Sequence, residues 1–182
     1  MIPMQVAIEA TLASFQQIAV LMKMMWTWPI VESIHFVGLT LLFGSIAAWD
    51  LRLLGMSSGV PMAAFHRLVP FAILGFTMNV TTGFLFLVAY PDQYVYNAAF
   101  QVKLLCLLLA GLNVAGFYLF IFRRVTALVA GEPLPIAARA SGAISLLLWT
   151  TIIICGRMIT FFRPPPCGIG DATGLLAQCI VR

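Results

Sequence analysis

The chain has 182 residues, of which 62% are hydrophobic and 9% are charged, and its formal net charge is +4. Soluble domains are about 45–50% apolar and about 25% charged, so this composition indicates a membrane protein and excludes an ordinary soluble domain. The ten Lys and Arg residues are scattered and form no basic patch, so no nucleic-acid partner is expected.

The first 25 residues predict an amphipathic helix. Its apolar residues recur at steps of four and three, which places them on one stripe of a helix. They are Ile8, Leu12, Phe15, Ala19 and Met22. We expect this helix to lie in the membrane interface or to pack on the end of a helix bundle. Because a basic start and a clear cleavage site are missing, it does not read as a signal peptide.

Residues 26–162 contain four long apolar segments, at about 29–51, 67–90, 98–122 and 140–162. A helix of about 20 residues crosses a hydrocarbon core of roughly 30 Å, so each segment is long enough to span a bilayer. The short connections predict an all-α fold, an integral membrane antiparallel four-helix bundle. The remaining residues, 163–182, begin with a run of prolines and predict an extended tail.

The distribution of Lys and Arg predicts how the bundle is oriented. The connections after the first and third spans carry five Arg residues, whereas the opposite side carries three basic residues outside the helices. Because cytoplasmic loops are enriched in Lys and Arg, both termini are expected outside the cytoplasm. On this orientation the tail is expected in the periplasm.

Two of the four cysteines lie in that tail. A disulfide between Cys167 and Cys179 would persist in an oxidising periplasm and would add roughly 3 kcal/mol of stability. The alternative is a pair of free thiols. Cys106 and Cys155 lie within spans, where a buried cysteine usually acts as a small hydrophobic residue.

The first span carries the ionisable residues that single it out. Glu32 and His35 are three residues apart, so they share one helix face. His35 lies roughly 9 Å inside the span, and Lys103 and Arg157 lie near the same ends of the third and fourth spans. The four side chains are therefore expected at one level of the outer leaflet, where charges pair with one another or with a ligand.

Two interpretations of this group remain open. In a structural network, Glu32 neutralises Lys103 or Arg157, or the two cations extend to the headgroups. In a cofactor site, His35 binds the iron of haem b and the two cations hold the haem propionates.

Other residues have secondary places in the haem interpretation. Gly38 and Gly44 would leave room for a flat macrocycle against the first span. Met158, or else Met78, is a candidate sixth ligand. His66 lies at the other end of the membrane from His35 and is not expected to ligate the same iron.

Copper is a weaker alternative to haem. Met22, Met24 and Met25 offer soft sulfur ligands that Cu(I) favours, with His35 nearby. A zinc or di-iron site would need further ligands that the sequence does not place together.

Polar residues elsewhere have structural interpretations. At the cytoplasmic end, Asp50 and Arg52 are expected to form a solvated or turn-fixing ion pair, and His66 and Arg67 to contact lipid phosphates. Asn79 and Asn113, in the middle of spans, are expected to form hydrogen bonds between helices.

The pattern WP–E–H–G–DLRLLG over Trp28–Gly55 resembles an uncharacterised family of small bacterial four-span membrane proteins. Thr82-Gly83 and Gly156-Arg157 look like the rest of that pattern. The layout is also loosely similar to CopD-like copper-resistance domains and small b-type cytochromes, whose histidines bind metal or haem. The ionisable group itself favours a redox module that holds haem b and passes electrons to or from other membrane or periplasmic redox subunits. The alternative is a cofactor-free accessory subunit of a larger membrane complex; neither function is catalytic.

Overall fold

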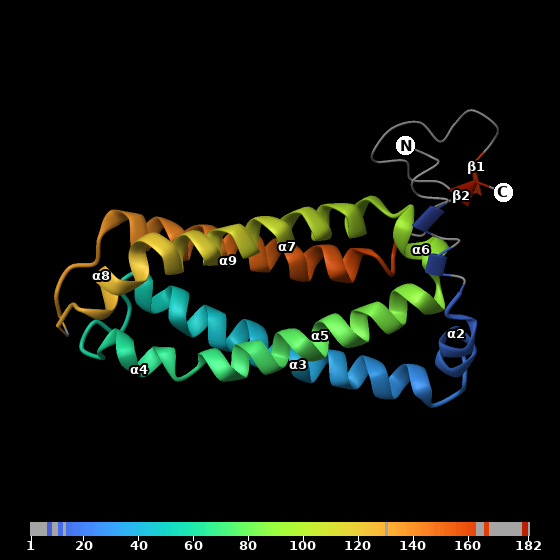
Figure 1. Cartoon of the computed structure of the whole chain (residues 1–182), viewed down its shortest axis with the longest axis horizontal. Helices are drawn as coiled ribbons and strands as arrows, with labels where there is room; N and C mark the ends of the chain where they lie inside the picture. Colours follow the sequence, from blue (N-terminus) through green and yellow to red (C-terminus); the bar gives the residue numbers. More distant parts are fainter. Residues whose placement is uncertain are drawn as a thin grey trace. The chain divides into compact units, whose positions relative to one another are not determined.

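The computed structural model describes residues 7–8, 11–12, 14–129 and 131–162, and the backbone of 166–167 and 180–181. Almost all of the described chain is helical, which confirms the all-α fold (Figure 1). The elements are α2 (Gln16–Met22), α3 (Thr27–Leu53), α4 (Met62–His66), α5 (Val69–Ala89), α6 (Pro91–Val95), α7 (Ala98–Gly116), the π-helix η1 (Phe117–Ile121), α8 (Phe122–Thr126), α9 (Ile136–Met158), and the two-residue strands β1 (Pro166–Cys167) and β2 (Ile180–Val181).

The four predicted spans are present as helices that are long and apolar enough to cross a membrane. They are Thr27–Leu53, Met62–Ala89, Ala98–Thr126 and Ile136–Met158. The second span is interrupted between α4 and α5, because Pro70 has no N–H to donate and is tolerated only in the first turn of a helix. The third contains the π-helix Phe117–Ile121, a rare geometry that often marks functional sites.

The residues group into two compact units, and each of the four spans contributes to both. Unit 1 comprises residues 1–35, 79–105 and 152–182, and unit 2 comprises residues 36–78 and 106–151. Each unit therefore contains segments that are far apart in the sequence.

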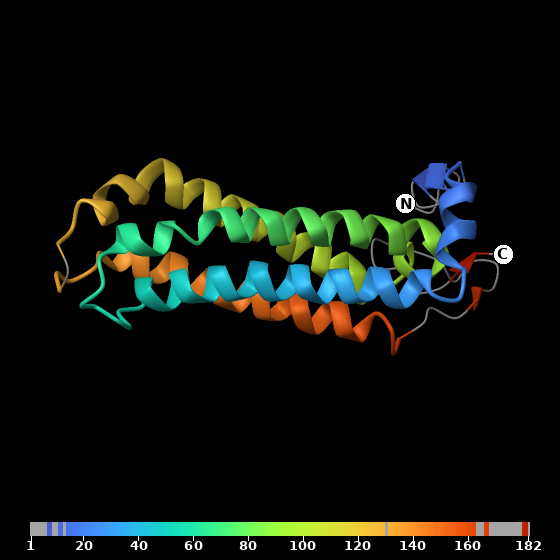
Figure 2. The same ribbon diagram turned by 90° about the horizontal axis from the view of Figure 1, so that it is seen from below.

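In unit 1 the N-terminal segment packs against the helices of the spans. Leu12 and Met22, from the predicted stripe, are 8% and 2% exposed. Met22 packs with Val31 of α3 and with Phe86 and Ala89 of α5, where α2 lies beside the ends of these helices (Figure 2). The segment thus contacts α3 and α5, and its position in the membrane interface stays a prediction. Ile8 and Phe15 of the same stripe are 42% and 39% exposed.

Asn97, which is 2% exposed, joins the start of α7 to the end of α9 within unit 1. Its Oδ1 accepts hydrogen bonds from the backbone N–H groups of Ala99 and Phe100, at 2.9 and 3.3 Å, and so caps α7. Its Nδ2 donates to the carbonyls of Ile159 and Phe162, at 3.4 and 2.7 Å. One side chain therefore satisfies terminal backbone groups of two helices.

Replacing Asn97 with Ala is expected to lower the free energy of unfolding by about 2–3 kcal/mol, because a helix cap is lost and buried backbone groups lose their partners. Thermal and denaturant unfolding in detergent measure the change. Gln93→Ala in α6 is the matched control, since the Gln93 side chain makes no hydrogen bond to another described residue. Equal unfolding midpoints for the two variants would contradict the joining role of Asn97.

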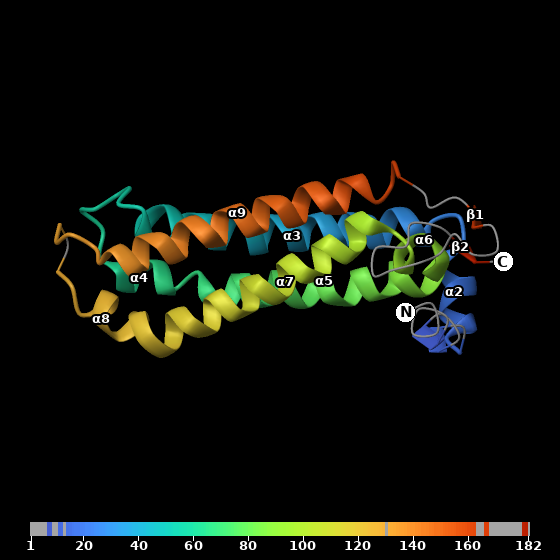
Figure 3. The same ribbon diagram turned by 90° about the horizontal axis from the view of Figure 1, so that it is seen from above.

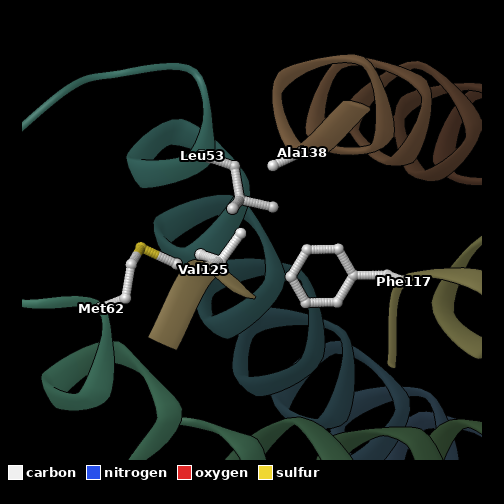
Figure 4. Packing of buried hydrophobic residues seen from close by; sticks show 5 residues of the cluster. All are labelled: Leu53, Met62, Phe117, Val125 and Ala138. Carbon is white, nitrogen blue, oxygen red and sulfur yellow. The ribbon is translucent and has the colours of Figure 1, made fainter. Parts of the chain in front are cut away.

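Unit 2 has a compact apolar core to which each of the four spans contributes (Figure 4). Its buried residues are Leu53, Met62, Phe117, Val125 and Ala138. Nearby, α9 approaches α3 closely, as Figure 3 shows, and a Cβ atom added at Gly142 would lie 3.0 Å from Leu53 Cβ and 3.1 Å from the Asp50 carbonyl oxygen.

The contact between α3 and α5 in unit 2 is closer still. A Cβ atom added at Gly75 would lie 2.5 Å from both the Gly38 carbonyl oxygen and the Leu42 amide nitrogen. Glycine at position 75 is therefore what lets the two backbones meet. Gly38, expected from the sequence to leave room for a macrocycle, is buried at this helix–helix contact.

His66 of α4 lies among aromatic side chains in unit 2. Its ring packs against those of Phe122, Trp49 and Tyr118, with centroid distances of 5.2, 6.0 and 6.4 Å. The ring thus packs on aromatic side chains beside the π-helix, and the contact with lipid phosphates stays a prediction.

The strands β1 and β2 pair in parallel, with Pro166 opposite Ile180 and Cys167 opposite Val181. The proposed Cys167–Cys179 disulfide and the extended proline run of the tail lie outside the described residues. Both remain predictions.

Candidate functional site

His35 is fixed by a hydrogen bond between two spans. Its Nδ1 lies 2.7 Å from the Oγ1 atom of Thr82. Thr82 is a residue of α5 that faces α3, and its side chain is 4% exposed. The Thr82 hydroxyl also lies 3.3 Å from the carbonyl oxygen of Asn79, to which it donates. Because a hydroxyl has a single hydrogen, both bonds form together when His35 donates through Nδ1.

That arrangement determines what the other side of the imidazole can do. With the proton on Nδ1, Nε2 carries a lone pair, and it has no hydrogen-bond partner among the described residues. The ring also packs edge-to-face on Phe86, at a centroid distance of 5.6 Å. A histidine held through Nδ1 and open at Nε2 has the usual arrangement of a metal-ligating histidine.

Lys103 of α7 is the second member of the group. Its charge acts on His35, and it lies close to Cys155 of α9. A Cβ atom added at Gly156 would lie 3.6 Å from Lys103 Nζ, so the ammonium rests against a helix position without a side chain. No carboxylate of the described chain lies within ion-pair distance of Lys103. Lys103 is thus a half-buried cation available for an anionic partner.

The other predicted site residues lie in unit 1 with different surroundings. Glu32 is half-buried and acts electrostatically on Tyr94, and it makes no ion pair with Lys103 or Arg157. Arg157 is exposed, and its guanidinium lies 4.9 Å above the ring of Phe161. Met158 is 40% exposed. Of the predicted group, only Lys103 acts electrostatically on His35, and the ion pairs expected of a structural network are not formed by the described residues.

The methionines proposed for copper do not converge. Met22 is buried in an apolar core at 2% exposure, whereas Met24 and Met25 are 58% and 81% exposed. No group of three or more His, Cys, Asp and Glu side chains suited to a metal ion is found within the described ranges.

Tyr94 lies in the connection between the second and third spans, and the charge of Glu32 affects the pKa of its phenol. Burial, and next the negative charge of Glu32, raise the pKa of the Tyr94 phenol to about 12. A folded-state pKa above the unfolded value of about 10 means that its stabilising contribution is complete below about pH 10. That contribution is lost as the pH rises through 12.

Replacing Glu32 with Gln is therefore expected to lower the pKa of Tyr94, because the charge that opposes tyrosinate formation is removed. Alkaline titration of tyrosinate absorbance, with Tyr94→Phe used to assign the step, measures the shift. Asp92→Asn, in the same short helix, is the control. A Tyr94 titration that Glu32→Gln leaves unchanged would contradict the electrostatic contact.

Unit 2 corrects the prediction for Asp50 and Arg52. Arg52 donates from Nε and Nη2 to the carbonyls of Val60 and Ser58, at 2.9 and 3.3 Å, and so holds the turn by itself. Asp50 is 3% exposed and lies close to Ser145 of α9, so it is neither solvated nor paired with Arg52. The cause is that α3 continues to Leu53, which keeps Asp50 inside the helix and turned toward α9.

The prediction for Asn113 is confirmed. Its Nδ2 donates to the Ser141 carbonyl at 3.1 Å, and its Oδ1 accepts from the Ser141 hydroxyl at 3.1 Å.

Sequence reasoning missed Thr82 as the partner of His35 and Ser145 as the partner of Asp50. The sequence did contain an indication for Ser145. Ser141 and Ser145 are four residues apart in the fourth span, so they form a polar face on one side of α9.

Four helices long and apolar enough to cross a bilayer, with large apolar side chains exposed along them, define an all-α chain of the multi-pass membrane class. No protein-family model, curated protein or solved structure matches the chain.

Proposed function

We propose that the protein is a small redox module that binds haem b through His35 and passes electrons within a membrane complex. The observation that carries the proposal is the Nδ1–Oγ1 bond of 2.7 Å to Thr82, which leaves Nε2 of His35 available. A haem supplies four of its own iron ligands, so one histidine is a sufficient protein contribution. That requirement suits a site without three convergent ligand side chains among the described residues.

Lys103 supports the proposal through its charge. A half-buried ammonium without a carboxylate partner among the described residues suits a propionate group, which needs a cationic partner. Lys103 also lies within electrostatic range of His35. Arg157, which is exposed beside Phe161, would serve a second propionate or a lipid headgroup. When bound, haem b would supply one-electron chemistry, and the chain would hold and orient it.

The membrane arrangement belongs to the same proposal. The four spans would cross a bacterial inner membrane as an antiparallel bundle, with both termini in the periplasm, as the Lys and Arg distribution favours. His35 would then lie in the outer leaflet, and the partners would be membrane or periplasmic redox subunits. The resemblance to small four-span bacterial membrane proteins and b-type cytochrome layouts points in the same direction.

The visible spectrum of the detergent-purified protein, oxidised and then reduced with dithionite, tests the proposal. We expect a Soret band that shifts on reduction, in a preparation that contains iron. A folded, colourless preparation that takes up no added haem would refute it.

A second function is favoured by the same hydrogen bond. If the role of Thr82 is only to satisfy His35 between α3 and α5, the protein is a cofactor-free accessory subunit of a larger membrane complex. This function predicts a colourless protein that copurifies with other membrane subunits and aggregates without them.

A further inference from the structure

Unit 2 carries an excess of positive charge, and all of its basic residues are arginines. Five arginines and two acidic residues give the unit a formal net charge of +3. Both acidic side chains are occupied elsewhere. Asp50 is 3% exposed, and the Glu132 carboxylate accepts a hydrogen bond from the Val129 N–H at 2.9 Å. Neither carboxylate forms an ion pair with an arginine among the described residues. The charge of the arginines is therefore not neutralised within the unit.

Four of the five arginines are exposed, and they surround the apolar core of unit 2. They are Arg67, Arg123, Arg124 and Arg139. Val125 and Ala138, the sequence neighbours of the last two, are 0% exposed members of that core. The ring of His66, beside the first, lies 5.2 Å from the ring of Phe122, beside the second. Figure 3 shows α4, α8 and the first turn of α9 at the same end of unit 2. Residues that are scattered in the sequence thus meet at one end of this unit.

The connections at this end are fixed to one another by the fifth arginine and by a loop hydrogen bond. Arg52 is 3% exposed, and it donates to the carbonyls of Val60 and Ser58 at 2.9 and 3.3 Å. The backbone N–H of Gly131 donates to the same Ser58 carbonyl at 3.0 Å. The loop after the first span is thereby tied to the loop after the third. The exposed arginines stand on a framework that is already ordered, which lowers the entropic cost of binding a ligand.

The chemistry of this end indicates an anionic ligand with an apolar part. Guanidinium groups match phosphate geometry and bind it in a bidentate manner. Further into the same spans, Phe71 lies four residues from Arg67, and Phe120 lies three residues from Arg123. Their side chains are 52% and 82% exposed. A phospholipid has a phosphate at the level of the helix ends and acyl chains along the spans. A free phosphate has no part that would contact the two phenylalanines.

We propose that this end of unit 2 is a binding surface for anionic phospholipids. The exposed arginines would bind the phosphodiester headgroups, and the acyl chains would lie against the exposed apolar side chains of the second and third spans. The proposal extends the lipid contact expected for Arg67 to arginines of the third and fourth spans, and it selects anionic over zwitterionic lipid. It is separate from His35 and does not rest on the redox function.

Electron paramagnetic resonance of spin-labelled lipids tests the proposal on the full chain in phosphatidylcholine vesicles. We expect labelled phosphatidylglycerol to associate with the protein about fivefold more strongly than labelled phosphatidylcholine, which corresponds to the contribution of about one arginine near a membrane surface. The preference should fall to about one in the triple variant R67Q/R123Q/R124Q. Lys23→Gln is the control, because Lys23 Nζ lies 5.3 Å from the centre of the Tyr90 ring in unit 1. This variant should keep the preference, and circular dichroism checks that both variants retain their helices.

A second variant separates headgroup recognition from diffuse surface charge. R123K/R124K keeps both charges but loses the planar guanidinium groups, so the preference should fall part of the way. An unchanged preference in this variant, or in the triple variant, would overturn the proposed surface. Displacement of the labelled lipid by inorganic phosphate would show a site for a free anion and would overturn the lipid assignment. Equal association of the two lipids with the native chain would leave the arginines to an acidic protein partner, and the proposal would fail.

Discussion

Replacing His35 with Ala is expected to abolish the Soret band and the spectral change on dithionite reduction, with helix content retained. The imidazole Nε2 is the protein ligand proposed for the iron, and an alanine offers no substitute. Absorption spectra and haem titration of the purified variant in detergent measure the loss, and circular dichroism checks the fold.

His66→Ala is the matched control for this variant. His66 packs against Trp49, Tyr118 and Phe122 in unit 2, so its removal should leave the haem spectrum intact. Thr82→Val should give an intermediate result, with haem affinity about 10–100-fold weaker, because the group that orients His35 is removed. A full Soret band in His35→Ala would show that the iron ligand lies elsewhere.

Replacing Gly75 with Ala is expected to give a large loss of stability for a change of one methyl group. The new Cβ would lie 2.5 Å from two backbone atoms of α3, the Gly38 oxygen and the Leu42 nitrogen. Backbone atoms cannot rotate away, so α3 and α5 must separate, at a cost of about 3 kcal/mol or more. Thermal and denaturant unfolding in detergent measure the loss.

Gly83→Ala on the same helix is the control, because a Cβ at Gly83 would meet no atom within 4 Å. Alanine is the better helix former by about 0.5–1 kcal/mol, so this variant should be neutral or slightly more stable. If Gly75→Ala unfolds at the same midpoint as Gly83→Ala, the close backbone contact is not present in the protein.

The sequence by itself determined the fold class and the four long apolar helices, because both depend on local properties. An apolar run of a given length forms a helix suited to a bilayer wherever it lies in the chain. The break before Val69 also has a local cause, the proline at position 70. The identification of His35 as an unusual ionisable residue in a span rests on the same local reasoning.

The partners of the polar residues were decided only by the tertiary structure. Which face of a helix meets which neighbour depends on packing between segments far apart in sequence, and no local pattern records it. Thus Thr82 holds His35, Lys103 lies against Gly156, and Arg157 turns to Phe161. Asp50 differs from the expected surface ion pair for the same reason: α9 approaches at Gly142, and that contact buries the carboxyl group beside Ser145.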